Sequence, residues 1–180
     1  AITIFNNFAD IHWRCMAHIN TFINAEDLLP CLKQCGCDEV FIGIESGSCI
    51  VRRQIHKVGS IDDILNICSR ILNAGIDIKG YFICGFPHET KKQMDETVQL
   101  AHRLKKISLD SNGKFRATAF QFRPYHGTEL YDQLIKDGIL VEHFMIKNNT
   151  SSKKQYSYIA GNFSEVPDEY IKKCIDDIVR

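Results

Sequence analysis

The chain has 180 residues, of which 44% are hydrophobic and 24% are charged, and its 22 Lys and Arg balance its 22 Asp and Glu. This globular composition excludes a strong electrostatic field of either sign, so nucleic acid is not indicated as a partner. No apolar run approaches the roughly 18 residues of a membrane span, and the N-terminus lacks the order of a signal peptide, so we expect a cytoplasmic protein with no membrane partner. The eight cysteines are scattered through apparent strands and helices, which indicates reduced thiols and not a disulfide framework.

The first third of the chain predicts a strand, a helix and a second strand. Residues 10–19 read as a strand, and residues 25–36 read as a helix with Asp27 as its N-cap and Gly36 at its end. The run "DEVFIGI" is almost continuously apolar after its two acidic residues, as expected for a strand that is covered on both faces. This strand should end at Glu45, before a Gly/Ser turn.

The pattern then continues with alternating helices and strands. Residues 60–75 form the clearest predicted helix, because Ser60 and Asp63 have capping-box spacing and apolar residues recur along one stripe. The stretch "KGYFIC" predicts the next strand, and Thr90 with Gln93 again marks a helix start. The remaining predicted elements are a strand at 115–124, a helix at 127–138 and, after a polar loop at 147–155, a terminal helix that begins near Pro167 and packs on the core.

This alternation predicts an α/β fold with parallel strands joined by right-handed crossovers. Two architectures fit the pattern, an open doubly wound sheet and an arc of a (β/α) barrel. In both, ligands gather at the C-terminal ends of the strands. We place residues 1–146 in this unit and residues 147–180 in a polar loop and docked terminal helix.

The predicted strand ends supply a set of candidate site residues, namely His18, Glu45-Ser46-Gly47, Gly85-Phe86-Pro87 and Arg123-Pro124-Tyr125. For His18, a packing or hydrogen-bonding role is favoured over a ligand role. Phe120 and Phe122 are expected in the core.

Four blocks carry a family resemblance: "GCDEVFIGIESGS", "IHKVGSIDDI", "NAGIDIKGYFICGFPHET" and "FQFRPYHGTELY". In this order and spacing they resemble the second half of the catalytic barrel of radical S-adenosylmethionine enzymes, over roughly residues 12–140. The closest resemblance is to the group often joined to a cobalamin-binding domain. It implies a partial (β/α) barrel of parallel strands with helices on the outer face.

The resemblance also implies a cofactor site for S-adenosylmethionine. Glu45 would accept hydrogen bonds from the ribose hydroxyls, since a carboxylate can accept from both hydroxyls of a diol. Lys57 would face the methionine carboxylate, and Ile83 and Gly85 would lie against the adenine. Ser46 and Arg123 complete the expected cofactor-binding set, while no catalytic residue is assigned. For Glu45, the structural alternative is a helix cap or a pair with a lysine, and for Lys57 it is a solvated surface position.

The family binds a [4Fe–4S] cluster through three cysteines spaced C-x3-C-x2-C, and the stretch "CLKQCGC" only superficially resembles this motif. Cys31 and Cys35 lie one helical turn apart on a predicted buried stripe, and Cys37 enters the next strand. We therefore expect core positions here and no metal ligand in this chain.

The cluster-binding part and any cobalamin domain are then expected in a missing N-terminal part of a parent chain. This chain would be a fragment of a radical S-adenosylmethionine enzyme of the Fe–S oxidoreductase or methyltransferase type, inactive alone because its chemistry needs an electron from the cluster. Two alternatives stay open, a nucleotide-binding module without redox chemistry and a non-catalytic scaffold that binds a partner.

Overall fold

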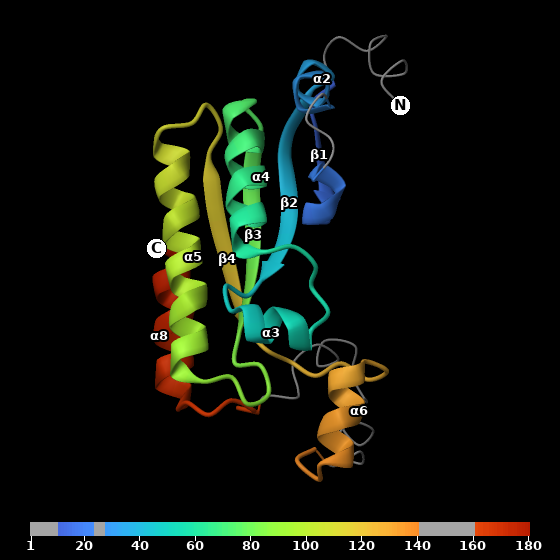
Figure 1. Cartoon of the computed structure of the whole chain (residues 1–180), viewed down its shortest axis with the longest axis vertical. Helices are drawn as coiled ribbons and strands as arrows, with labels where there is room; N and C mark the ends of the chain where they lie inside the picture. Colours follow the sequence, from blue (N-terminus) through green and yellow to red (C-terminus); the bar gives the residue numbers. More distant parts are fainter. Residues whose placement is uncertain (1–10, 24–27, 141–160) are drawn as a thin grey trace.

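A computed structural model describes residues 11–23, 28–140 and 161–180. Its centre is a sheet of four parallel strands, which lie side by side in chain order (Figure 1). The strands are β1 (Trp13–Ala17), β2 (Cys37–Glu45), β3 (Asp77–Cys84) and β4 (Phe115–Gln121). Parallel strands in chain order with intervening helices make this an α/β fold of the partial-barrel type, as the sequence predicts.

The helices are placed by the same alternation. They are the 3-10 helix η1 (Ile19–Phe22), α2 (Leu28–Gln34), α3 (Cys49–Gln54), α4 (Ile61–Asn73), α5 (Lys91–Leu109), α6 (Glu129–Lys136) and α8 (Asp168–Val179). Buried side chains of α4, α5 and α8 share one apolar core with the sheet. In Figure 1, α3 and α6 lie near the lower end of the molecule, toward which β2 points, and α2 lies at the opposite end. The carboxyl ends of the strands therefore face α3 and α6.

Side-chain alternation gives the sheet two different faces. Val40, Ile42 and Ile44 of β2 are fully buried in the core shared with the helices. Glu45 comes next along β2 and, like other alternate residues of the strand, is only partly buried. The end of β2 therefore presents this carboxylate on the face away from the core.

The predicted helix starts are confirmed by their caps. Ser60 and Asp63 form a reciprocal capping box at the start of α4, and Thr90 and Gln93 form another at the start of α5. Each box satisfies two backbone N–H groups that the first helical turn would otherwise leave unpaired. Gly75 follows α4 with a φ of 77°, a conformation that glycine adopts without strain.

Some elements differ from the sequence predictions. Neither η1 nor α3 was predicted, because both are too short to show a helical apolar period. The expected N-cap Asp27 and the polar loop at 147–155 lie outside the described residues. The same holds for the expected boundary at residue 146, so the division of the chain into two parts stays a prediction. Helix α8 does pack on the core, through Ile171, Cys174 and Ile178.

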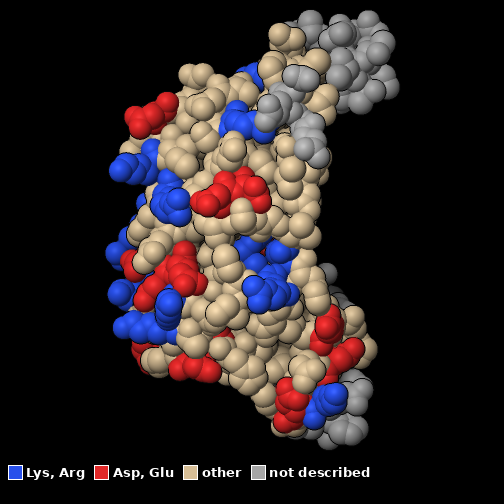
Figure 2. Space-filling view, in the orientation of Figure 1, with Lys and Arg blue, Asp and Glu red and all other residues tan. Residues whose placement is uncertain are grey.

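On the face of the molecule drawn in Figure 2, acidic and basic side chains are interspersed. In Figure 2, Lys and Arg alternate with Asp and Glu along the side of the molecule where α5 lies. This distribution agrees with the equal numbers of acidic and basic residues in the sequence.

Within the described residues, none of the helices is both long enough and apolar enough to cross a membrane.

Candidate functional site

A cavity of about 670 Å³ opens at the carboxyl ends of β2, β3 and β4. Ligand sites of parallel α/β folds lie at this end of the sheet. The lining consists of Glu45, residues 54–57, Ile83, Phe86, residues 120–123, Tyr125 and residues 128–130. The cavity is therefore bounded by three strand ends, by the segment after α3 and by the start of α6.

An acidic and a basic side chain lie together on this cavity. The Lys57 ammonium is 3.2 Å from Oε1 of Glu45, and their side chains are only 22% and 19% exposed. Lys57 also donates to the carbonyl oxygen of Gly43 at 3.3 Å. A Cβ atom on Gly43 would lie 2.4 Å from Oε1 of Glu45, so a side chain at that position would displace the carboxylate. The pairing of Glu45 with a lysine, one of the structural alternatives from the sequence, is thus present.

The backbone of Glu45 has an unusual conformation. Its φ is 67°, in the left-handed region that non-glycine residues rarely occupy. The pairing of β2 with β3 shifts its register between Gly43 and Glu45, so the regular strand geometry is interrupted there. Such strained residues persist where their surroundings hold them, and they cluster at functional sites.

Four of the six predicted cofactor residues line the cavity, namely Glu45, Lys57, Ile83 and Arg123. Ser46 does not line the cavity. Its buried hydroxyl lies 3.1 Å from that of Thr97 on α5. Gly85 also lies outside the lining, and a Cβ there would come within 3.2 Å of Ile171 on α8. The structure therefore brings together residues of β2, β3, the segment after α3 and the end of β4, but not the second residue of the Glu45-Ser46 pair.

Two aromatic candidates from the strand ends, Phe86 and Tyr125, line the cavity, but Phe120 and Phe122, which also line it, were not predicted as site residues. Phe120 is 52% exposed and lines the cavity, so its expected place in the core is wrong. Phe122 is buried as expected, yet it also lines the cavity, and its ring centroid lies 5.1 Å from that of Phe86. The two phenylalanines of "FQF" directly precede the expected strand end at Arg123-Pro124, and this position could have indicated an aromatic wall of the site.

A second contact, between an imidazole and a carboxylate, joins two parts of the cavity lining. Nε2 of His56 lies 2.9 Å from Oε2 of Glu129, and both side chains are exposed. This contact joins the segment after α3 to the start of α6. Being solvent-exposed, it contributes little to stability.

His18 follows β1, and its ring takes part in a local cap. Its Nδ1 accepts a hydrogen bond from the backbone N–H of Asn20 at 3.3 Å, which agrees with the hydrogen-bonding role expected from the sequence. Burial, together with the positive charges of Lys57 and Arg52, lowers the pKa of His18. The imidazole is thus held toward its neutral form near these cations.

Glu89 is a buried acid beside the cavity. It is 1% exposed, and its Oε2 accepts from the backbone N–H groups of Gly85 at 2.6 Å and Phe86 at 3.0 Å. Burial raises the pKa of Glu89 to about 7, against the opposing effect of these two hydrogen bonds. Glu89 therefore fixes the turn that carries Phe86 onto the cavity wall.

The cysteines do not form a recognisable metal centre. All eight lie in the described part of the chain and none forms a disulfide there, and no three His, Cys, Asp or Glu side chains of that part are grouped as metal ligands. Cys35 and Cys37 are buried and Cys31 is half-buried. These residues do not fit an iron–sulfur cluster, which requires converging thiolates.

The arrangement suits a ligand with several kinds of group. A half-buried carboxylate can accept from hydroxyls, an ammonium can bind a carboxylate, and the apolar wall of Ile83, Phe120 and Phe122 can cover a planar ring. Glu45, Ile83 and Phe120 lie at the ends of β2, β3 and β4, so the sheet fixes the distances between them.

Two known proteins are similar to this chain in sequence. The chain shares 31% identity with an uncharacterized methyltransferase of Pyrococcus horikoshii over 73% of its own length and 27% of that protein. It shares 28% identity with a tRNA-2-methylthio-N(6)-dimethylallyladenosine synthase of Clostridium tetani over 59% of its length and 23% of that protein. The chain thus spans about a quarter of the length of these relatives.

Two solved structures are similar in fold. Elp3 of Methanocaldococcus infernus superimposes with a TM-score of 0.57 at 14% identity, over 72% of this chain and 29% of that one. The cobalamin-dependent S-adenosylmethionine radical enzyme OxsB, with aqua-cobalamin and S-adenosylmethionine bound, superimposes with a TM-score of 0.53 at 17% identity, over 76% of this chain and 20% of that one. The family model "Radical SAM superfamily" matches residues 4–101, which is more than half of the chain. The chain belongs to the radical SAM superfamily.

Proposed function

We propose that this chain provides the nucleoside and carboxylate side of an S-adenosylmethionine site in a methyltransferase or methylthiotransferase of the radical SAM superfamily. The observation that carries the proposal is the Glu45–Lys57 pair beside Ile83 on one cavity at the strand ends. The two relatives named above, a methyltransferase and a methylthio-adenosine synthase, support the reaction class. When bound in an enzyme of this family, S-adenosylmethionine supplies radical or methyl-transfer chemistry.

The residues of the cavity fit the proposed ligand. The Glu45 carboxylate would accept from the two ribose hydroxyls, while the Lys57 ammonium would move from Glu45 toward the methionine carboxylate. Ile83 and Phe120 would cover the adenine and exclude water from it. Within the described residues there is no cluster-binding group, so we expect the cluster and any cobalamin site in other parts of the whole protein.

Two ligands separate the roles of the charged residues. S-adenosylmethionine carries both the ribose and the methionine carboxylate, whereas 5′-methylthioadenosine lacks the carboxylate. We expect the isolated chain to bind S-adenosylmethionine weakly, with a Kd of about 1 mM. Glu45→Ala should weaken both ligands about fivefold or more, and Lys57→Ala should weaken S-adenosylmethionine alone by a similar factor, through lost hydrogen bonds.

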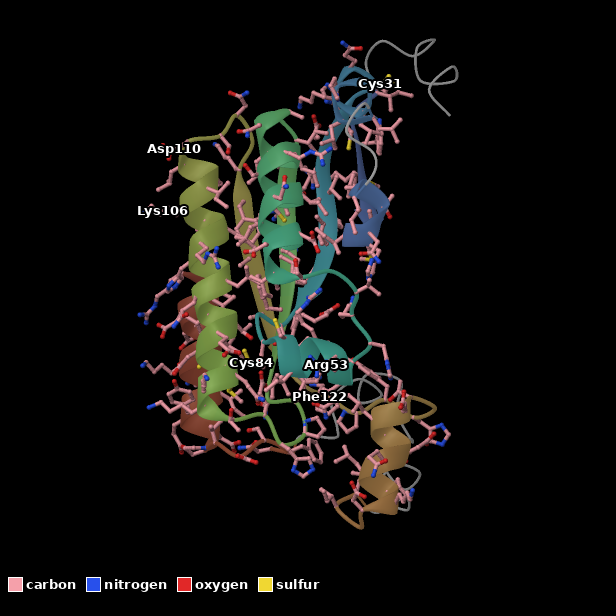
Figure 3. All side chains as sticks on the ribbon, in the orientation of Figure 1. Cys31, Arg53, Cys84, Lys106, Asp110 and Phe122 are labelled. Carbon is pink, nitrogen blue, oxygen red and sulfur yellow. The ribbon has the colours of Figure 1, made fainter. Side chains whose placement is uncertain are left out.

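The measurement is a titration of each variant followed by NMR. Asp110→Asn and Lys106→Ala are matched controls, because both residues lie at the upper end of α5, far from the Phe122 end of the molecule (Figure 3). Unchanged affinity in Glu45→Ala and Lys57→Ala would refute the proposed site. Equal loss of both ligands in Lys57→Ala would instead favour a nucleotide-binding module in which Lys57 has no carboxylate partner.

A further inference from the structure

Arg52 is a buried cation next to the proposed cofactor site. It lies on α3 and is 3% exposed, although arginine is almost never this buried unless it is paired. Its Nη1 donates to the carbonyl oxygens of Ile44 at 2.7 Å and Ser46 at 3.4 Å. Its Nη2 donates to the carbonyl oxygens of Val58 at 2.9 Å and Gly59 at 3.4 Å. All four of these acceptors belong to the backbone, so the guanidinium connects two chain segments.

The positions of these acceptors relate Arg52 to the site. Ile44 and Ser46 are the two neighbours of Glu45, and Val58 and Gly59 directly follow Lys57. The backbone N–H of Lys57 in turn donates to the carbonyl oxygen of Arg52 at 2.8 Å. The guanidinium of Arg52 therefore holds the backbone on both sides of Glu45 and at the two residues that follow Lys57, while the main-chain carbonyl of Arg52 holds the N–H of Lys57.

Glu45 needs such support. Its left-handed backbone, with a φ of 67°, costs on the order of 1–3 kcal/mol. The ladder pairs Glu45 with Phe82, but its register shifts between Gly43 and Glu45, so the regular pairing of β2 with β3 is interrupted next to the strained residue. The bonds from Arg52 to Ile44 and Ser46 bracket the strained residue and fix the direction of its side chain.

We propose that Arg52 is a positioning residue for the cofactor site: its guanidinium holds the Glu45 carboxylate and the Lys57 ammonium side by side on the cavity. The inference rests on the proposed function for its ligand, but the bracing itself is independent of any ligand. A lysine cannot replace the guanidinium, because its single nitrogen atom cannot contact both the carbonyls of Ile44 and Ser46 and those of Val58 and Gly59. Arg53, the exposed neighbour on the same helix, provides a matched control.

The first test reads the backbone without a ligand. In Arg52→Lys, the NMR Cα and amide resonances of Glu45 and Lys57 should move, while resonances of α4 and α5 stay in place, and Arg53→Lys should move neither group. Unchanged Glu45 and Lys57 resonances in Arg52→Lys would overturn the proposal. If Arg52→Lys does not fold, the wild-type protein can be measured instead. Four hydrogen bonds to backbone carbonyls require that the guanidinium of Arg52 rotates slowly and that its protons are protected from exchange. Rapid rotation would overturn the proposal.

The second test separates this inference from the proposed function. Arg52→Lys should weaken S-adenosylmethionine about tenfold, as expected for two or more lost hydrogen bonds, and Arg53→Lys should have no effect. In a chain that already carries Glu45→Ala and Lys57→Ala, adding Arg52→Lys should have less than about a twofold further effect. An undiminished effect in that background would contradict a positioning role. If Glu45→Ala and Lys57→Ala leave affinity unchanged, the proposed function fails, while the resonance test still decides on Arg52.

Discussion

The buried carboxyl group of Glu89 links the stability of the fold to pH. Its folded pKa of about 7 lies above the ordinary value of 4.5, so the folded state holds the proton more tightly. The resulting contribution is fully present below pH 4.5 and is lost as the pH rises toward 7, at a total cost on the order of 3 kcal/mol. In Glu89→Gln, the amide oxygen can still accept from Gly85 and Phe86, and this loss should disappear.

Urea unfolding of wild type and Glu89→Gln between pH 4.5 and 8 checks this prediction. The free energy of unfolding of wild type should fall relative to the variant as the pH rises. The exposed Glu169→Gln serves as the control and should run parallel to wild type. Parallel curves for Glu89→Gln as well would show that Glu89 is already ionised when folded.

Individual site residues were predictable only in part. The end of an apolar strand indicated Glu45, and the structure places it on the cavity with Lys57. The left-handed φ of Glu45 was not predictable, because nothing in its residue type favours that conformation. The buried position of Arg52 was not predictable either, because arginines are ordinarily exposed and its four carbonyl partners lie at the end of β2 and in the segments before and after α3, a helix that the sequence did not reveal.

Among the elements, α4 offers a direct test of the capping signal in the sequence. Oγ of Ser60 accepts from the backbone N–H of Asp63 at 3.1 Å, and the Asp63 carboxylate accepts from the Ser60 backbone N–H at 2.8 Å. Ser60→Ala should therefore lower the free energy of unfolding by about 1 kcal/mol. Ser69→Ala, within the same helix, should change stability much less, because it loses only the exposed 3.4 Å contact from the Asn73 amide and gains alanine, the better helix former.

Thermal or urea unfolding of the two variants gives the comparison. Equal effects of Ser60→Ala and Ser69→Ala would mean that the capping box does not contribute to stability.

Element prediction succeeded where local signals were strong. The helices α4 and α5 begin at the capping boxes read from the sequence. Helix α3 has six residues, and Ser48 at its N-cap makes no side-chain capping bond, so no comparable signal was available. Missing α3 had a consequence for the site, because this helix brings Lys57 back to Glu45.

For the whole molecule, the order of elements left two parallel α/β architectures, and the family resemblance favoured the barrel arc over the open doubly wound sheet. Alternating strands and helices allow few topologies, and the observed sheet has the parallel, sequential order expected for an arc of a (β/α) barrel. The same order brings strand ends to one edge, so the general place of the site also followed from the sequence. The cavity and its aromatic wall did not, because Phe120 could not be assigned to either face without the register of β4.

The most direct test of the account is an experimental structure of the chain with S-adenosylmethionine bound at saturating concentration. We predict the ribose hydroxyls within hydrogen-bonding distance of the Glu45 carboxylate, the methionine carboxylate at the Lys57 ammonium, and the adenine against Ile83 and Phe120. A ligand bound elsewhere, or one bound in the cavity with Glu45 and Lys57 still paired only to each other, would contradict the account.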